Sequence, residues 1–319
     1  MDTDDVPNIG GEPVDPEAGV ILGIDFGGTK VAVGLATAGG ELLLERRLDT
    51  DAAAGADQAV TRSLALADRM LAEHAGELSA VGVVSPGIVL DDRILLAPNV
   101  PGWEQLRLRE LVADRFGHVP IAVGTDAKAA ALAECRWGAL AGADPGIFLS
   151  VGTGLAAAVV VGGQVLTGAH GAAGEIGYNL RGPHDRSTSA SLEEAVAGRG
   201  LGDRATQLTG RPTTAAELFA LAEHNQAAAD LLAEALDELA VHVANLANTI
   251  DPERIAVGGG LTASADKLFP ALRRRLDQVV PFPPGLVPAR FEQDGALRGA
   301  VALAMDRTGC RPAEPELTS

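Results

Sequence analysis

One short pattern occurs twice in this chain: an apolar run, a turn of glycine and threonine, and a second apolar run. The first copy, VILGIDFGGTKVAVGL, covers residues 20–35, and the second, IFLSVGTGLAAAVVV, covers residues 147–161. Apolar runs of this length that are bounded by turn residues are typical of buried strands. Because the opening pattern restarts in mid-chain, we predict two copies of one α/β domain rather than two unrelated domains.

The first turn has the features of a phosphate loop. Gly27 and Gly28 remove Cβ atoms where the backbone turns, so amide N–H groups and the Thr29 hydroxyl can face an anion. Asp25 ends the strand before the turn and would repel a bare phosphate, so we expect a Mg²⁺ ion, held through water, between them. On this segment alone, an ordinary glycine β-turn with Asp25 as a turn residue fits as well.

The composition supports two tightly packed domains. The chain has 319 residues, 47% of them apolar and only 3% aromatic, so the cores are built from Ala, Val, Leu and Ile. The formal net charge is −18, and no stretch forms a basic stripe. We therefore expect no nucleic-acid partner.

The cysteines and the chain ends indicate a cytoplasmic protein. Cys135 and Cys310 are too few for a disulfide framework, which favours a reducing compartment. Residues 1–18 are acidic, contain prolines and glycines and lack the features of a signal peptide, so we expect a disordered tail. Residues 307–319 are expected to form a second loose end, and no apolar run is long enough to cross a membrane.

The rest of the chain alternates strands with helices. Further strands are predicted at residues 41–50, 79–84, 118–125, 163–168 and 254–260, and helices at residues 58–74, 106–116, 127–140, 214–223, 227–250, 264–279 and 295–305. We expect an N-terminal lobe of residues 19–125 and a C-terminal lobe of residues 126–294, with a cleft between them. The last helix, up to residue 306, is expected to pack back on the N-terminal lobe.

The order of the motifs resembles the ROK family of sugar kinases, glucokinases among them, and transcriptional repressors. DFGGTK (25–30) resembles the family's first phosphate motif, SVGTGLAAAV (150–159) the second, and AVGGGL (256–261) the adenosine loop. SPG (85–87), APNVPGW (97–103), TDA (125–127) and GAAGEIG (171–177) resemble its sugar-side motifs. The resemblance spans residues 19–305 and implies the duplicated ribonuclease-H-like fold of the actin-like ATPases.

By this resemblance Asp126 is the catalytic base. A carboxylate at the end of a central strand can take the proton of a sugar hydroxyl as that hydroxyl attacks a phosphate, and capping the following helix is compatible with this role. Asn99 and Glu175, with backbone groups near Gly87, would bind sugar hydroxyls. Alternatives are a turn asparagine before Val100 and a solvated loop carboxylate.

On the nucleotide side, the resemblance implies ATP with Mg²⁺ as its companion. The two glycine turns would hold the phosphates, and a third glycine run would leave space beside the adenine ring, although it also fits a plain strand end. The residues concerned are Asp25, Gly27, Gly28, Thr29, Lys30, Gly152, Thr153, Gly154, Gly258, Gly259 and Gly260.

The chain departs from the family in the loop after residue 177. Most family kinases have a histidine there and then a CxCGxxGC loop that binds zinc, whereas this chain has Tyr178 and no cysteine between Cys135 and Cys310. His170 and His184 cannot supply four ligands, so we expect no zinc site. Tyr178 would then face the sugar or serve as a core or lid residue.

Three further positions differ from the family or are ambiguous. Glu193 is a second candidate sugar-facing carboxylate, although Glu194 follows it directly. Thr125 and Lys128 stand where relatives usually carry asparagines. We expect Lys128 on the solvated face of its helix; pointing inward, it would lower the pKa of Asp126.

The leading hypothesis is an ATP-dependent kinase for the 6-hydroxyl of glucose or a related hexose. One alternative is an amino-sugar kinase, for example one acting on kanosamine, and another is a catalytically silent sugar-binding protein. A repressor would need a DNA-binding segment, and the acidic residues before the first strand do not fit one. We expect a small-molecule sugar as partner, no nucleic acid, no membrane, and a homodimer.

Overall fold

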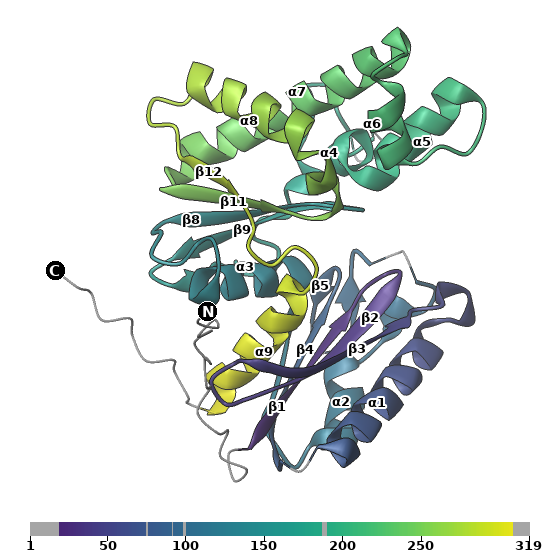
Figure 1. The fold of residues 1–319 in the computed structure, drawn as a ribbon, viewed down its shortest axis with the longest axis vertical. Coiled ribbons are helices and arrows are strands. Elements are labelled where there is room, and N and C mark those ends of the chain that lie inside the picture. The colour runs from purple at the N-terminus through teal and green to yellow at the C-terminus, as the bar shows by residue number, and fades with distance from the viewer. Residues whose placement is uncertain (1–18, 75, 91, 98–99, 187–189, 309–319) are drawn as a thin grey trace, which may run out of the picture.

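The protein folds into two lobes, each built around a five-stranded sheet (Figure 1). The computed structural model describes residues 19–74, 76–90, 92–97, 100–186 and 190–308. The tail predicted at residues 1–18, Asn99, Cys310 and most of the second predicted tail lie outside these ranges.

The first sheet has the strand order β3-β2-β1-β4-β7. Its members are β1 (Val20–Phe26), β2 (Lys30–Ala36), β3 (Leu42–Asp49), β4 (Leu78–Ser85) and β7 (Ile121–Thr125). The first three form an antiparallel meander, and β4 and β7 join parallel to β1. Since the strands β1 and β4 are almost wholly buried, their apolar runs are continuous rather than alternating.

The second sheet repeats this topology with the order β10-β9-β8-β11-β12. It contains β8 (Gly146–Val151), β9 (Leu155–Val161), β10 (Gln164–Val165), β11 (Arg254–Gly258) and β12 (Gly285–Pro288). Three antiparallel strands are again followed by two parallel ones, which confirms the predicted duplication. The strand predicted at residues 163–168 is only two residues long, and β12, which lies in a proline-rich stretch, was not predicted.

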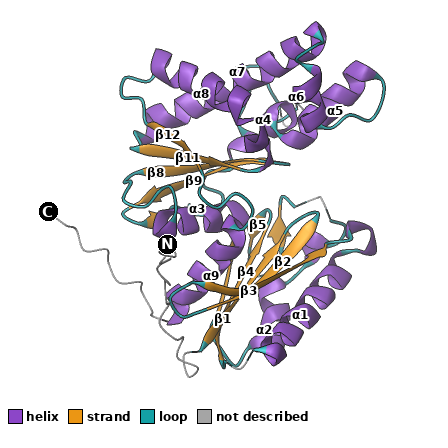
Figure 2. Ribbon diagram, in the orientation of Figure 1, coloured by secondary structure: helices purple, strands orange, loops and turns teal. Residues whose placement is uncertain are grey.

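Helices cover the outer face of each sheet (Figure 2). In the first lobe these are α1 (Ala56–Glu73) and α2 (Leu108–Phe116), close to the predicted ranges. In the second lobe they are α4 (Leu192–Val196), α5 (Gly198–Thr209), α6 (Ala215–Leu221), α7 (Gln226–Ile250) and α8 (Ala265–Val279). Within the described ranges, no helix combines the length and apolarity needed to cross a bilayer.

Two helices, α3 (Asp126–Trp137) and α9 (Gly295–Thr308), lie between the sheets and pack against each other (Figure 1). The helix α9 crosses β1, β4 and β7, while α3 also contacts β8 and β9. The last helix therefore lies on the first lobe's sheet, and it extends to Thr308, beyond the predicted end. On β3, the Arg47 guanidinium donates to the backbone carbonyl of Gln293 at 3.3 Å, just before α9.

A row of glycines makes room for α9. Gly34, Gly23 and Gly82 are paired across β2, β1 and β4. A Cβ atom at Gly82 would lie 1.8 Å from the backbone oxygen of Ala300 on α9, and one at Gly23 would lie 2.9 Å from a methyl group of the same helix. These glycines let the helix approach the sheet closely.

Candidate active site

The first glycine turn connects β1 and β2 and is held from behind by Thr50. Gly27 N–H donates to the carbonyl of Lys30 at 2.9 Å, and a Cβ atom at Gly27 would lie 2.6 Å from that oxygen. The Thr50 hydroxyl donates to the Gly27 carbonyl at 2.6 Å, and Thr50 N–H donates to the Thr29 carbonyl at 2.8 Å. Thr29 and Lys30 are exposed, and Gly28 is half-buried. The turn is therefore fixed while its outer surface stays free for a ligand.

Sequence reasoning did not identify Thr50. Its side chain is completely buried, and its carbonyl accepts from the Arg62 guanidinium of α1 at 2.6 Å. No motif marks this position, because its role depends on the pairing of β3 with β2. Only the pairing of the strand predicted at residues 41–50 with the strand before it could have placed Thr50 beside the turn.

Asp25 lies at the end of β1 on the face that looks toward α9. It pairs in register with Ala32, which pairs with Arg47, so the three side chains share one face of the sheet. Burial raises the pKa of Asp25 to about 7, the nearby charge of Asp126 adds to the increase, and Arg47 opposes it. A carboxylate in this environment gains from a cation, as the predicted Mg²⁺ would provide.

The second glycine turn, between β8 and β9, is held by the start of α5. Gly152 N–H donates to the Gly154 carbonyl at 3.0 Å. The backbone N–H groups of Gly198 and Arg199 donate to the carbonyls of Gly152 and Thr153 at 2.8 and 3.2 Å. Thr153 itself is exposed. Both turns thus present a threonine to solvent while backbone hydrogen bonds fix the glycines.

Glu193 packs against this second turn. One of its carboxylate oxygens accepts from Leu155 N–H at 2.9 Å, and a Cβ atom at Gly154 would lie 2.6 Å from the same oxygen. The structure therefore shows Glu193 supporting the turn, a role that sequence reasoning did not assign. Contact of Glu193 with a sugar stays a prediction.

The third glycine run ends β11 beside the second turn. Gly259 has a φ of 94°, and a Cβ atom there would lie 2.6 Å from the backbone of Val151. Gly258 packs against the ring of Phe148, whereas nothing lies within 4 Å of the Cβ position of Gly260. The run therefore closes one side of the second turn and leaves open space at Gly260.

Asp126 is the first residue of α3. Thr125 precedes the helix without a side-chain capping bond, and one Asp126 oxygen accepts from Ala127 N–H at 2.7 Å. Burial raises the pKa of Asp126 to about 6, and the charge of Glu175 adds to this, whereas the Ala127 hydrogen bond and Lys128 oppose it. A carboxyl group with this pKa is ionised at neutral pH and can still accept a proton during a reaction.

Lys128 is not on the solvated face of its helix, contrary to our expectation. Its side chain is buried, and its ammonium group lies 3.1 Å from a carboxylate oxygen of Glu175. Only 10% of the Lys128 side chain and 19% of the Glu175 side chain are exposed. Glu175 is therefore not a solvated loop carboxylate either. The sequence could not show this pair, because its partners are far apart along the chain.

The turn at residues 85–87, which we expected on the sugar side, is connected by Trp103 to the strand that leads into the first glycine turn. The indole Nε1–H donates to the Ser85 hydroxyl at 2.8 Å, and that hydroxyl donates to the carbonyl of Pro86. The Trp103 ring meets the edge of Phe26, the neighbour of Asp25, with centroids 5.5 Å apart. Gly87 has a φ of 82°, which favours glycine. Trp103 thus ties together two motifs that are distant in sequence.

Two predicted sugar contacts have different outcomes. Asn99 lies outside the described residues, so the structure does not place it. Tyr178 is 56% exposed, which excludes a core position. Partial burial raises the pKa of the Tyr178 phenol, and the surrounding charges of Glu193, Glu175 and others add to it. Tyr178 is therefore an exposed residue with carboxylates around it, and its contact with a sugar stays a prediction.

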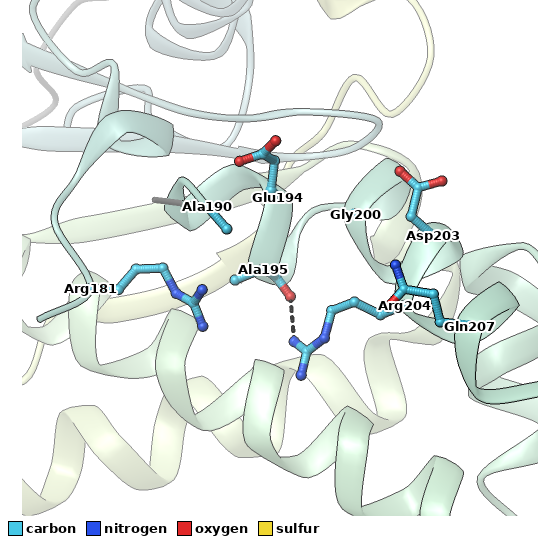
Figure 3. A pocket seen from close by; sticks show the side chains of 8 residues that line it. All are labelled: Arg181, Ala190, Glu194, Ala195, Gly200, Asp203, Arg204 and Gln207. Carbon is cyan, nitrogen blue, oxygen red and sulfur yellow. Dashed lines mark hydrogen bonds between the residues drawn. The ribbon is translucent and has the colours of Figure 1, made fainter. Parts of the chain in front are cut away.

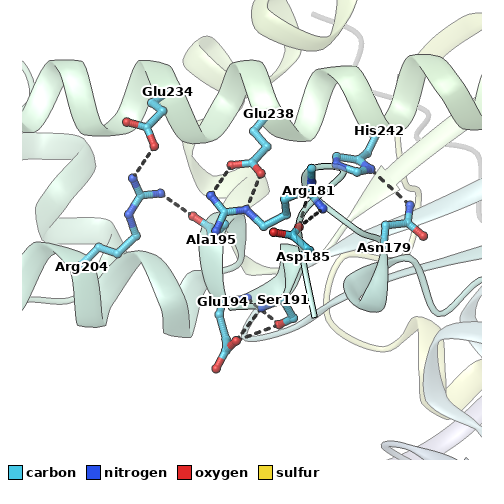
Figure 4. Close-up of polar contacts among 11 residues, drawn as sticks. Asn179, Arg181, Asp185, Ser191, Glu194, Ala195, Arg204, Glu234, Glu238 and His242 are labelled. Atoms are coloured by element: carbon cyan, nitrogen blue, oxygen red, sulfur yellow. Dashed lines mark hydrogen bonds and ion pairs between the residues drawn. The ribbon is translucent and has the colours of Figure 1, made fainter. Parts of the chain in front are cut away.

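The cysteine-free loop is attached to α7 by the ion pair between Arg181 and Glu238 (Figure 4). The Arg181 guanidinium binds the Glu238 carboxylate with two hydrogen bonds, one of them 3.0 Å long. Within the loop, Asp185 accepts from the backbone N–H groups of Arg181 and Gly182 at 2.6 and 2.8 Å. Among the residues that the structure describes, no group of three or more His, Cys, Asp or Glu could hold a metal ion.

A cavity of about 410 Å³ lies beside this loop (Figure 3). Arg181 and Arg204 line it from one side and Glu194 and Asp203 from another. Arg204 donates to the Ala195 carbonyl at 2.8 Å and also pairs with a glutamate on α7. Both guanidinium groups thus already have partners.

The sequence pattern of the ROK family matches residues 21–307. The chain belongs to the ROK family. This membership agrees with the duplicated sheets, which form the ribonuclease-H-like fold of the actin-like ATPases, with two lobes. The predicted family and fold class are both confirmed.

Several relatives within the ROK family are sugar kinases. The chain is 29% identical to a glucokinase from Thermotoga maritima, over 91% of this chain and 98% of that protein. It is 32% identical to an N-acetylmannosamine kinase from Shigella boydii serotype 18, over 89% of this chain and 97% of that protein. A solved ROK glucokinase from Streptomyces griseus, in complex with glucose and AMPPNP, superimposes with a TM-score of 0.72 at 30% identity, covering 90% of this chain and 100% of that one.

Proposed function

We propose that this protein transfers the γ-phosphate of ATP to a sugar, at the 6-hydroxyl of a hexose such as glucose. One observation carries the proposal: Asp25 lies at the end of β1 and Asp126 directly follows β7, and the parallel strands β1, β4 and β7 end at the same edge of the first sheet. The candidate base and the candidate phosphate site are therefore neighbours. The kinase relatives, and the AMPPNP bound to one of them, support the use of ATP.

In this reaction Asp126 accepts the proton of the sugar hydroxyl. The hydroxyl oxygen forms a bond to the γ-phosphorus while the bond from that phosphorus to the bridging oxygen breaks, and ADP leaves. Backbone N–H groups and the hydroxyls of Thr29 and Thr153 would hold the phosphates. A Mg²⁺ ion, contacted by Asp25 through water, would supply positive charge against the phosphate oxygens.

On the sugar side we propose Gly87, Asn99 and Glu175 as the main contacts. Tyr178 and Glu193 are further candidates, since the charge of Glu193 reaches the Tyr178 phenol. Lys30, Gly258, Gly259 and Gly260 complete the proposed nucleotide site.

An amino-sugar kinase is the second candidate, and one observation favours it. Partial burial and the charges of four carboxylates, those of Glu193, Glu175, Glu104 and Glu194, raise the pKa of the Tyr178 phenol, whose residue is 56% exposed. This concentration of negative charge would attract an ammonium group on a sugar such as kanosamine.

The test is ADP formation with Mg-ATP across glucose, mannose, N-acetylmannosamine, glucosamine and kanosamine, for the wild type and Asp126→Ala. We expect turnover with at least one sugar and a loss of roughly 10²- to 10⁴-fold in the variant. Equal rates in both proteins would remove Asp126 from the mechanism. No turnover with any sugar would favour the catalytically silent alternative. Metal analysis of the same preparation tests the expected lack of zinc.

A further inference from the structure

Lys128 differs from the other two lysines of the chain in its surroundings. Lys30 is exposed at the first glycine turn, and Lys267 forms a surface pair with Glu223. Lys128 instead lies one residue beyond Ala127 in the first turn of α3, with its side chain buried against Glu175. An ammonium group loses hydration there, so it depends on the carboxylate that it contacts.

Both the backbone and the side chain of Glu175 are held in place. The residue before it, Gly174, accepts from Ala157 N–H at 2.8 Å and has a φ of 85°. A Cβ atom at Gly174 would lie 1.8 Å from the Ala157 carbonyl oxygen, so the backbone lies directly on β9. The side chain is held at 3.1 Å by Lys128 on α3. The contact uses one carboxylate oxygen, and a carboxylate has further lone pairs for other donors.

Three charged side chains interact with Asp126. Glu175 directly precedes the short helical turn Ile176–Tyr178, Asp25 lies at the end of β1, and Lys128 lies on the same helix as Asp126. Of these three groups, Glu175 repels the ionised form of Asp126 and Lys128 stabilises it, while the charge of Asp126 raises the pKa of Asp25. Within the described residues, Lys128 is the cation that these contacts place beside Asp126.

We propose that Lys128 is a positioning residue for the transfer reaction, which holds Glu175 toward the sugar and keeps Asp126 ionised as the base. This inference rests on the proposed kinase function. The two effects of the Lys128 ammonium group can be measured separately. Orientation of Glu175 affects the KM for the sugar, and the charge beside Asp126 affects the acidic limb of the pH profile.

The test measures kcat/KM against pH for the best sugar of the panel, in Lys128→Met, Glu175→Gln and the double variant. In Lys128→Met we expect the acidic limb to shift to a pH about 1 unit higher, because the positive charge that stabilises ionised Asp126 is lost. In Glu175→Gln the limb should shift to lower pH, because the negative charge that repels ionised Asp126 is lost. In the double variant it should lie near the wild-type pH. The KM for the sugar should rise roughly tenfold in Lys128→Met.

Lys267→Met is the matched control, because its ammonium also lies 3.1 Å from a glutamate oxygen but on the surface of α8. Its pH profile should equal that of the wild type. Lys128→Arg keeps the positive charge, so the acidic limb of its pH profile should lie at the wild-type pH. If Lys128→Met does not fold, the downward shift in Glu175→Gln decides the question.

If folded Lys128→Met had the wild-type acidic limb and the wild-type KM for the sugar, the inference would be overturned. It would also be overturned if the acidic limb of the double variant lay at the same pH as that of Lys128→Met alone. If Lys128→Met is unfolded, an unshifted Glu175→Gln would overturn it as well. These results differ from failure of the proposed function, in which the wild type itself would show no sugar-dependent ADP formation.

Discussion

At the scale of single residues, the proposed site contains carboxylates whose ionisation opposes folding. Asp25 is the strongest case, because its pKa is raised from 3.8 to about 7. The folded state therefore binds a proton more tightly than the unfolded state, and this group's contribution to stability is lost as pH rises from about 4 toward 7. Asp126, with its pKa raised to about 6, acts in the same direction.

We predict that Asp25→Asn stabilises the ligand-free protein at pH 8. The amide keeps the shape of the side chain and removes the buried charge, so the free energy of unfolding should increase by on the order of 2 kcal/mol, with a smaller gain at pH 5. Urea unfolding at both pH values measures this. Asp114→Asn on the exposed surface of α2 is the control and should change little. A less stable Asp25→Asn at pH 8 would contradict the account.

A substitution at Gly260 can test nucleotide binding without disturbing the folded structure. Since nothing lies within 4 Å of its Cβ position, Gly260→Ala should leave the melting temperature unchanged. If the adenine ring lies beside this position, the added methyl group should raise the KM for ATP by roughly tenfold. Gly182→Ala, at a loop position that is equally open, is the control for both measurements. An unchanged KM for ATP in Gly260→Ala would remove this residue from the nucleotide site.

At the scale of elements, local signals were sufficient for most of the strands and long helices but not for α4 and α5. We predicted no helix over residues 192–209, although Ser191 and Glu194 form a capping box, a signal visible as S-x-x-E in the sequence. The same signal at Thr214 and Glu217 did mark a helix that was predicted. The short helix α4 has too few residues to show a periodic apolar pattern.

The attachment of the cysteine-free loop to α7 gives a prediction at this scale. Arg181→Met should lower the free energy of unfolding by about 1–2 kcal/mol, because it removes a two-bond pair that leaves the mostly buried Glu238 without its partner. Arg274→Met removes an exposed pair to Asp237, the neighbouring residue on α7, and should cost less than about 0.5 kcal/mol. Chemical unfolding of both variants tests the difference. Equal losses would show that the loop does not depend on this pair.

At the scale of the whole molecule, the duplicated sheet order could be predicted because each copy begins with its own strand, glycine turn and strand. The contacts that bring distant motifs together could not. The Trp103–Ser85 hydrogen bond, the support of Gly27 by Thr50 and the Lys128–Glu175 pair all depend on tertiary packing. Asp126 was placed at a helix start from local sequence, but its partners were not. The homodimer stays a prediction.

The central claim is that Asp126 serves as the base for phosphate transfer to a sugar. The most direct measurement is transfer of labelled γ-phosphate from ATP to the sugar by the wild type and by Asp126→Asn, with ATP affinity measured in parallel and Asp114→Asn as control. We predict a loss of roughly 10²- to 10⁴-fold in transfer by Asp126→Asn, with ATP affinity maintained. Transfer by Asp126→Asn at the wild-type rate would contradict the account.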